Sequence, residues 1–195
     1  MPKVVDADQR RSELADAAAR VIARSGIDGA SLREVAAEAG WTTGALVHYF
    51  ANKRELLAFT LQASLDRRRS RSADRASMSP AEALDATLRS ALPITPETTL
   101  HWIVTLAFAA QASADRELAA IQRDAYLDFR DTVSALVAGE RGTREVADRE
   151  AERLIALVNG IALQALFAPD LWTEQRQMDA FDAGFEAAFE TGLAR

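Results

Sequence analysis

Apolar residues recur at helical spacing in segment after segment of this 195-residue chain. The clearest case lies between residues 31 and 40, where the i, i+3, i+4, i+7 spacing of one helix face is formed by Leu32, Val35, Ala36 and Ala39. Ser31 precedes this face and Glu34 follows three residues later, which is the capping-box spacing that starts a helix. Gly40 stands where the chain can enter the left-handed region without steric cost, so we expect this helix to end there.

A second short helix is predicted directly after this glycine, over residues 43–49. Thr42 or Thr43 can supply its N-cap. Leu46 and Phe50, four residues apart, form its inward face. Two short helices joined by a tight glycine turn predict a helix-turn-helix.

The rest of the chain predicts further helices. Asn52 and Glu55 repeat the capping-box spacing at the start of a long helix. Hydrophobic residues make up 49% of the chain, alanine is abundant and β-branched runs are scarce, which favours helices over strands. We therefore predict an all-α fold of about nine helices, over residues 11–24, 31–40, 43–49, 53–72, 80–92, 99–112, 116–139, 145–167 and 172–192.

Composition disfavours several classes of protein. The chain has no cysteine, which rules out disulfides and thiolate metal sites. Its N-terminus lacks the apolar core of a signal peptide, and no apolar run approaches about 20 residues. We therefore expect a cytoplasmic protein without a membrane segment. With only two histidines and no nucleophile–base pair or metal-ligand spacing, we expect no catalytic residue, no metal and no cofactor.

The segment SLREVAAEAGWTTGALVHYFANKRELL resembles the DNA-binding signature of the TetR family of bacterial transcriptional regulators. The matching features are a first helix rich in small residues that ends in AG, a TxG opening of the recognition helix, the closing HYF and the K-x-E-L-L that follows. A second, looser resemblance, to the effector domain of the BetI-like branch of that family, is carried by WIVTLAFAAQASADRELAAIQRDAYLDFR and LIALVNGIALQALF.

The resemblance implies two domains. Residues 1–68 would form the DNA-binding head with its connector helix, and residues 69–195 a helical bundle for ligand binding and dimerisation. Charge agrees with this division, since residues 1–75 hold 13 Lys/Arg against 10 Asp/Glu, and residues 76–195 hold 10 against 19. A basic head on an acidic body is suited to DNA, although arginine-rich segments are often only solvated faces.

For the head, the resemblance implies binding to an operator in double-stranded DNA. An α-helix fits the major groove, and the expected contact residues are Ser31, Arg33, Thr42, Thr43, Gly44, Val47, His48, Tyr49 and Lys53. We expect Tyr49 and Lys53 to bind phosphate. The sequence leaves open that His48 packs or caps a helix, that Tyr49 is mainly core, and that Lys53 is an ordinary solvated lysine. Trp41 and Val47 depart from the usual family residues, so the operator sequence is not predicted.

For the body, residues 69–195, the resemblance implies a homodimer and a pocket for a small-molecule effector of unknown identity. Candidate interface residues are Gly160, Leu163, Leu166, Phe181, Phe185 and Phe189, although the phenylalanine stripe can also be intramolecular core. Candidate pocket residues are polar or aromatic side chains in apolar stretches, each of which can also simply pack: His101, Trp102, Phe108, Gln111, Gln122, Tyr126, Phe129, Asn159 and Gln164. The BetI-like resemblance raises choline-like or other small cations as one effector class without selecting them.

Two alternative functions remain beside a ligand-released repressor. Within regulators, an activator is the alternative, and only the family resemblance favours repression. Outside them, a helical adaptor could use the helix-turn-helix structurally and bind protein partners. The Thr-Thr-Gly opening beside Lys53 argues against an adaptor, because it leaves a short helix with little side-chain bulk, suited to contact with DNA.

Overall fold

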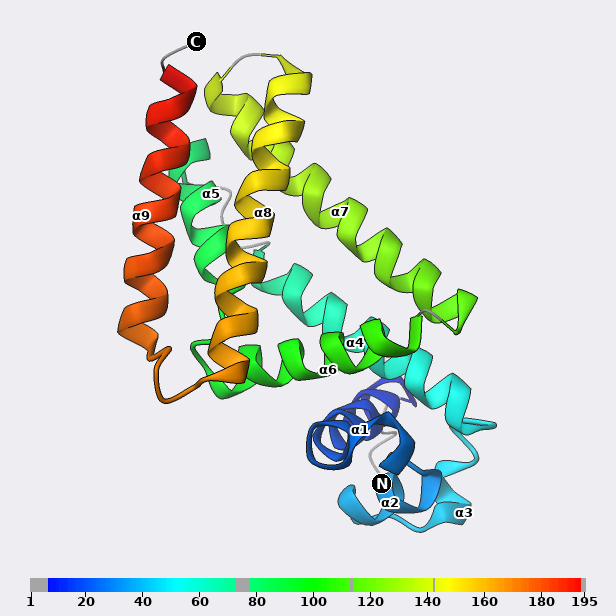
Figure 1. Ribbon diagram of the computed structural model, residues 1–195. Coiled ribbons are helices and arrows are strands. Elements are labelled where there is room, and N and C mark those ends of the chain that lie inside the picture. Colours follow the sequence, from blue (N-terminus) through cyan, green and yellow to red (C-terminus); the bar gives the residue numbers. More distant parts are fainter. Residues whose placement is uncertain (1–6, 73–77, 113, 142, 194–195) are drawn as a thin grey trace. The chain divides into compact units, whose positions relative to one another are not determined.

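The computed structural model describes residues 7–72, 78–112, 114–141 and 143–193 (Figure 1). Side chains are described in these ranges except at residues 71, 72, 140, 141 and 187–193. The described residues form nine helices and no strand, which confirms the predicted all-α fold. The helices are α1 (Ala7–Gly29), α2 (Leu32–Glu38), α3 (Thr43–Leu46), α4 (Lys53–Ser72), α5 (Pro80–Arg89), α6 (Pro96–Ala112), α7 (Arg116–Arg141), α8 (Arg144–Phe167) and α9 (Glu174–Leu193).

The chain divides into two compact units. One holds residues 1–67 and 100–123, and the other holds residues 68–99 and 124–195. The first unit therefore contains the helix-turn-helix together with most of α6 and the beginning of α7. The second contains α5, α8 and α9 with the rest of α7.

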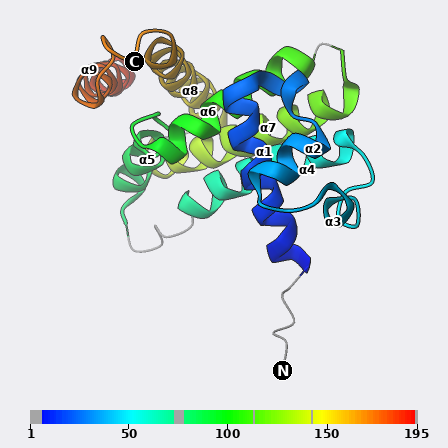
Figure 2. The ribbon, with the colours of Figure 1, turned by 90° about the horizontal axis from the view of Figure 1, so that it is seen from below.

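The core of the first unit is built around α1. Its buried face includes Leu14, Val21 and Ile22, each at most 2% exposed. The predicted turn after residue 24 takes the form of a break at Gly26, whose φ of 70° is open to glycine and strained for other residues. Ile27 then returns to the core at 8% exposed. α2 packs against both α1 and α3 (Figure 2).

The second unit depends on close packing of α8 against α9, which lie side by side (Figure 1). Gly184 on α9 allows this approach, because a Cβ there would lie 2.7 Å from both terminal methyl carbons of Leu157. Leu154 and Val158 of α8 are each 1% exposed. The second unit therefore has its own apolar core.

Two helix starts show how local chemistry sets the boundaries. Ser79 and Glu82 form a complete capping box at the start of α5, with Pro80 at the first helical position. α6 begins at Pro96, three residues earlier than predicted, because proline is tolerated in the first turn of a helix. Asp115 accepts backbone hydrogen bonds from Glu117 and Leu118 at 3.0 and 3.3 Å, and it starts α7 as predicted.

None of the helices in the described part of the chain combines the length and apolar character needed to cross a membrane.

Candidate nucleic-acid interface

The turn between α2 and α3 has the geometry of a Schellman motif. Gly40 has a φ of 71°, as the sequence predicted. The amide of Trp41 donates to the carbonyl of Ala36 at 2.8 Å, and the amide of Gly40 donates to Ala37 at 3.1 Å. These bonds satisfy the last carbonyls of α2 and fix the direction in which the chain leaves it.

The second helix of the helix-turn-helix, α3, is capped at its start and held by buried apolar side chains on its inner face. The Thr42 hydroxyl accepts a hydrogen bond from the amide of Ala45 at 3.1 Å, so Thr42 is the N-cap. Leu46 and Phe50 are both fully buried. The α-helix is shorter than predicted and ends at Leu46, after which the amides of Tyr49 and Phe50 both donate to the Leu46 carbonyl. This bifurcated turn still carries Phe50 into the core.

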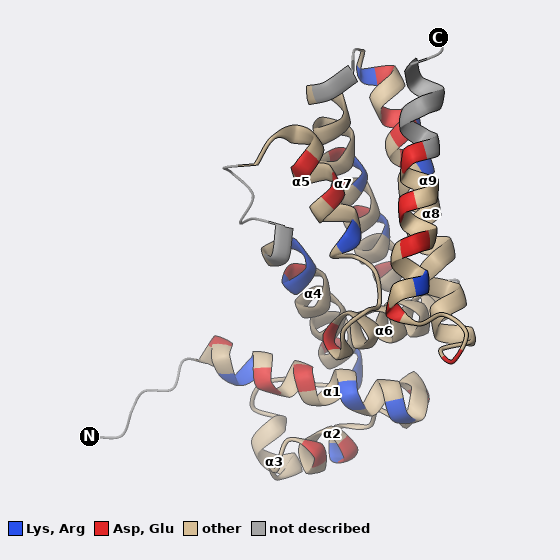
Figure 3. Ribbon diagram, turned by 90° about the vertical axis from the view of Figure 1, so that its left-hand side faces the viewer, with Lys and Arg blue, Asp and Glu red and all other residues tan. Residues whose placement is uncertain are grey.

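The outer face of α3 and its final turn is open and uncharged. Thr42, Thr43, Gly44 and His48 are exposed, and Val47 is 46% exposed. Figure 3 shows charged bands along α1, whereas α3 carries none. Hydroxyls, an imidazole and a valine methyl pair can form hydrogen bonds and thymine-methyl contacts on base edges.

The two aromatic residues at the ends of this segment pack on each other. Tyr49 and Trp41 are both half-buried, with ring centroids 5.5 Å apart in an edge arrangement. The guanidinium of Arg10 lies over the Trp41 ring at 5.3 Å. Tyr49 therefore has a packing role, and its predicted phosphate contact stays a prediction.

Three other predicted DNA-contact residues differ in how their side chains are held. Ser31 caps α2 by accepting from the amide of Glu34 at 3.1 Å, while its own amide donates to Gly29 and so takes no part in a reciprocal box. The Arg33 side chain is 83% exposed, with a loose ion pair to Glu34 at 3.5 Å. Lys53 is half-buried and donates to the backbone carbonyl of Asp28 at 3.0 Å.

Several of the head's arginines are neutralised within the first unit. Arg20 and Arg24 both bind the carboxylate of Glu38, at 2.8 and 3.0 Å. Their hydrogen bonds, with Arg20's the larger effect, lower the pKa of Glu38. Arg54 binds Asp115 and Glu117, each at 2.9 Å. The net positive charge of the head is therefore a weaker guide to DNA contacts than the sequence count suggested.

Sequence reasoning missed the arginine that supports the end of the recognition segment, which is α3 with its final turn, residues 43–50. Arg11 donates to the carbonyl of Tyr49 at 3.2 Å, and its guanidinium lies 4.6 Å from the ring centres of both Phe50 and Phe59. Spacing alone does not show this contact, because 38 residues separate Arg11 from Tyr49.

The predicted effector-pocket residues belong to both compact units. Five lie in the first unit, where His101 Nδ1 is 2.8 Å from the Ser64 hydroxyl and Gln122 donates to the Thr105 carbonyl at 3.0 Å. Phe108 is fully buried, and Trp102 is half-buried. Gln111 lines an open depression of about 330 Å³, whose other lining residues are Ile27, Asp28, Lys53, Arg54, Leu57, Asp115 and Leu118.

The remaining four pocket candidates lie in the second unit. Tyr126 is 43% exposed, and the Phe129 ring lies 4.3 Å from the guanidinium of Arg68. Asn159 and Gln164 are exposed on α8. A single pocket that joins all nine residues stays a prediction.

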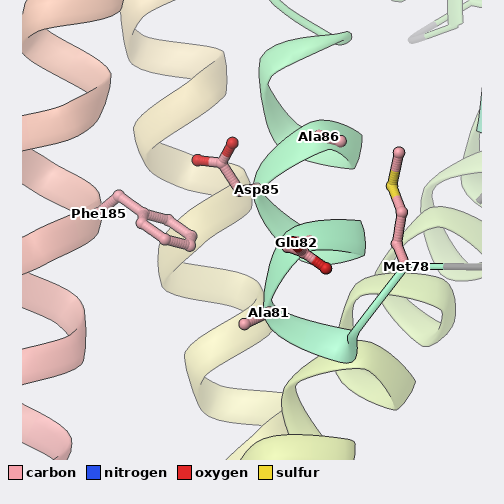
Figure 4. Close-up of a pocket in the computed structure, with 6 residues that line it drawn as sticks. All are labelled: Met78, Ala81, Glu82, Asp85, Ala86 and Phe185. Atoms are coloured by element: carbon pink, nitrogen blue, oxygen red, sulfur yellow. The ribbon is translucent and has the colours of Figure 1, made fainter.

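The second unit also has an open depression of about 650 Å³ beside α5, which the sequence pattern did not signal. Figure 4 shows Phe185 of α9 and Met78 on opposite sides of α5. The two acidic residues that line this depression already have intramolecular partners. Glu82 closes the Ser79 capping box, and Asp85 binds Arg89 at 2.7 Å.

The predicted dimer residues divide into core and surface. Phe181 is fully buried, with the Arg89 guanidinium 4.8 Å from its ring and the half-buried Phe185 stacked on it at 5.3 Å. Phe181 therefore has no free surface for a partner, and it takes the intramolecular role that the sequence left open. The side chain of Phe189 lies outside the described residues. The three predicted interface residues on α8 are half-buried, namely Gly160, Leu163 and Leu166.

Two exposed apolar residues at the end of α8 and in the turn that follows it were not predicted from the sequence. Phe167, the last residue of α8, is 77% exposed, and Leu171 is 64% exposed. Their position next to Pro169 resembled an ordinary helix end. Large apolar side chains exposed to this degree are candidates for an interaction surface where they form a contiguous patch.

Comparison with known proteins assigns both halves of the chain. Residues 14–58 match bacterial regulatory proteins of the tetR family, and residues 80–190 match the C-terminal domain of BetI-type transcriptional repressors. The chain is 36% identical over 173 residues to the HTH-type transcriptional regulator PksA of Bacillus subtilis, covering 87% of this chain and 84% of PksA. It is 32% identical over 171 residues to BetI of Rhizobium meliloti, covering 84% of this chain and 81% of that protein.

Solved structures agree with this assignment. A transcriptional regulator from Rhodococcus sp. Rha1 superposes with a TM-score of 0.83 at 35% identity, covering 93% of this chain and 96% of that one. A regulator from Saccharomonospora viridis, solved in complex with choline, shares the fold at a TM-score of 0.82 and 21% identity, covering 92% of this chain and 96% of that one. The chain belongs to the tetR family of bacterial regulatory proteins and is a DNA-binding transcriptional regulator, not an enzyme, with a BetI-type C-terminal domain.

Proposed function

We propose that this regulator is a repressor that binds a palindromic operator as a homodimer and is released by a small-molecule effector. The observation that carries the proposal is the open, uncharged face of α3, held from below by the fully buried Leu46 and Phe50. Thr42, Thr43 and Val47 would read base edges from this face, with Gly44 allowing close approach of the DNA backbone. The match of residues 80–190 to BetI-type repressors supports repression over activation.

Phosphate contacts would position this face on the duplex. Arg33 is suited to the role because its side chain is 83% exposed. Lys53 keeps two ammonium protons beyond the one that it donates to Asp28. Ser31 and Tyr49 would add neutral hydrogen-bond donors at the ends of the helix-turn-helix.

Dimerisation would supply the second half of the reading surface. A single short helix makes few base contacts, whereas a twofold dimer reads two half-sites about 34 Å apart. We place the dimer surface on α8 and the start of the following turn, with Phe167 and Leu171 as exposed apolar anchors beside Leu163 and Gly160. Phe181 is left out of this surface because it is core.

The effector would act by preferring the conformation that does not fit the operator. The choline complex of the Saccharomonospora viridis regulator supports a screen that begins with small cations. Two of the five candidate pocket residues in the first unit, His101 and Gln122, make part-buried hydrogen bonds, to the Ser64 hydroxyl and the Thr105 carbonyl.

Binding-site selection on random DNA duplexes tests the proposal. The expected result is an enriched inverted repeat that shifts in a gel at low protein concentration and is competed poorly by unrelated DNA. A chain that enriches no sequence would overturn the proposal and favour the adaptor alternative. The selected operator then serves for an effector screen, in which release of the complex identifies the ligand.

A further inference from the structure

The side chain of Arg11, on α1, packs against the connection between α3 and α4. Its guanidinium lies 4.6 Å from the ring centre of Phe50 and 4.6 Å from that of Phe59. The two rings are themselves 5.4 Å apart in a tilted arrangement. A planar cation close to both rings gains cation–π attraction from each, which restricts how Phe50 can move relative to α4.

The same guanidinium also makes two polar contacts at this connection. One terminal nitrogen donates to the carbonyl of Tyr49 at 3.2 Å, which is the residue directly before Phe50. The other lies 3.4 Å from a carboxylate oxygen of Glu55. Arg11 thus contacts the backbone that leaves the recognition segment and the first turn of the helix that follows.

Glu55 carries the contact further. Its second carboxylate oxygen accepts a hydrogen bond from the amide of Ala51 at 2.8 Å, and its own amide donates to the Asn52 side chain at 2.9 Å. Residues 49–55 are therefore held by a continuous set of bonds that starts at Arg11. These residues include the whole connection between the recognition segment and α4.

We propose that Arg11 is a positioning residue for DNA recognition, which sets the orientation of the recognition helix and does not itself bind phosphate. This inference rests on the proposed operator binding. Arg11 is only 30% exposed, and its guanidinium is engaged with two rings, a carbonyl and a carboxylate. Lysine cannot reproduce this set of contacts, because its ammonium is a point charge without a planar face or a fork of donors.

The test compares three variants on the operator selected by the wild-type chain and on unrelated DNA. Arg11→Met removes the charge and the contacts, Arg11→Lys keeps the charge, and Arg20→Met removes a charge from the same helix at the ion pair with Glu38. The affinity of each is measured across a series of salt concentrations. Far-UV circular dichroism and thermal unfolding monitor the fold.

Both Arg11 variants should lose about tenfold or more in operator affinity, because a contact array displaced by about an ångström loses much of its interaction energy. Affinity for unrelated DNA should change less, and the salt slope should stay at its wild-type value. A phosphate-binding Arg11 predicts the reverse, with a slope lower by about 0.9 in Arg11→Met, equal losses on both DNAs and rescue by lysine. That second pattern, or wild-type operator affinity in Arg11→Lys, would overturn the inference.

Glu55→Gln keeps the inference testable if Arg11→Met fails to fold. It retains the shape of the side chain and removes the charge that faces Arg11. Glu55→Gln should lose less operator selectivity than Arg11→Lys does. The loss in the double variant should be less than the sum of the two single losses, since both residues act on one network. Full additivity contradicts a shared positioning role. A wild-type chain that selects no operator refutes the proposed function instead, so the two failures are distinct.

Discussion

Lys53 Nζ donates a hydrogen bond to the backbone carbonyl of Asp28, at a distance of 3.0 Å. This bond links the first residue of α4 to the end of α1. In the sequence, the helix-turn-helix lies between these two residues. The lysine predicted to bind phosphate therefore has an intramolecular partner as well. One ammonium can serve both, because it carries three donors.

Lys53→Ala should weaken binding to operator and unrelated DNA to a similar degree, because a phosphate contact carries no sequence information. The salt slope should fall by about 0.9, the value for one phosphate. Fluorescence anisotropy at several salt concentrations gives both quantities. An altered base preference in repeated site selection would contradict the phosphate role.

Gly44→Ala should separate stability from DNA binding. A Cβ at Gly44 meets only the Thr42 hydroxyl at 3.9 Å, so alanine fits and should raise the free energy of unfolding by up to about 1 kcal/mol. The same methyl would point into the DNA surface and lower operator affinity. Denaturant unfolding and gel shifts measure the two effects.

Gly40→Ala is the matched control for that substitution. A Cβ at Gly40 meets nothing within 4 Å, but Gly40 has a φ of 71°, so alanine should cost about 1–2 kcal/mol. If Gly44→Ala and Gly40→Ala changed the free energy of unfolding in the same direction, backbone conformation would not explain the effect of alanine at these two positions.

Phe167→Asp should convert the proposed dimer into a monomer with little change in helix content, since this side chain is 77% exposed. A buried carboxylate at the interface would have no partner. Sedimentation velocity reports the oligomeric state, and the monomer should no longer shift the operator at low concentration. Val146→Asp, at a residue 45% exposed on the same helix, is the control that should stay dimeric. A dimer that survives Phe167→Asp would remove Phe167 from the interface.

Phe181→Ala should behave as a core truncation. Phe181 is fully buried beneath Arg89 and Phe185, so its removal should lower the free energy of unfolding by about 3–5 kcal/mol. Denaturant titration measures this loss. A variant with unchanged stability but weakened association would return Phe181 to the dimer surface.

Glu38 should add an acid-sensitive component to the stability of the head. Arg20 and Arg24 lower its pKa below the ordinary 4.5. The stabilisation is therefore fully present well above pH 4.5 and is lost as the pH falls through the lower folded-state pKa. Thermal unfolding of the wild type and Glu38→Gln between neutral pH and pH 3 should show a stability difference that shrinks toward low pH. A difference that stays constant would contradict the pairing.

The local structure of the helix-turn-helix was predictable because short-range chemistry determines it. Ser31, Thr42 and Asn52 each cap a backbone amide three residues ahead, and Gly40 adopts the left-handed conformation that ends α2. These interactions lie within a few residues of one another. Helical periodicity likewise predicted that Leu46 and Phe50 would be buried.

Contacts between residues far apart in the chain were decided only by the tertiary structure. The phenylalanine stripe of α9 was compatible with either a core or an interface. In the fold Phe181 is fully buried, and the guanidinium of Arg89, 92 residues earlier in the chain, lies 4.8 Å from its ring. The exposure of Phe167 could not be read from a pattern that describes its own helix alone. Periodicity shows that a face is apolar, but what covers that face depends on which distant helix packs there.

The sequence by itself indicated the family through the resemblance of its motifs. It also determined the helical fold and the residues at the surface of α3, because both follow from local spacing and side-chain type. Only the tertiary structure showed that Arg20, Arg24 and Arg54 are used in ion pairs and that Arg11 supports the recognition segment. Charge can be counted along a chain, but its availability to DNA depends on partners that folding brings within about 3 Å.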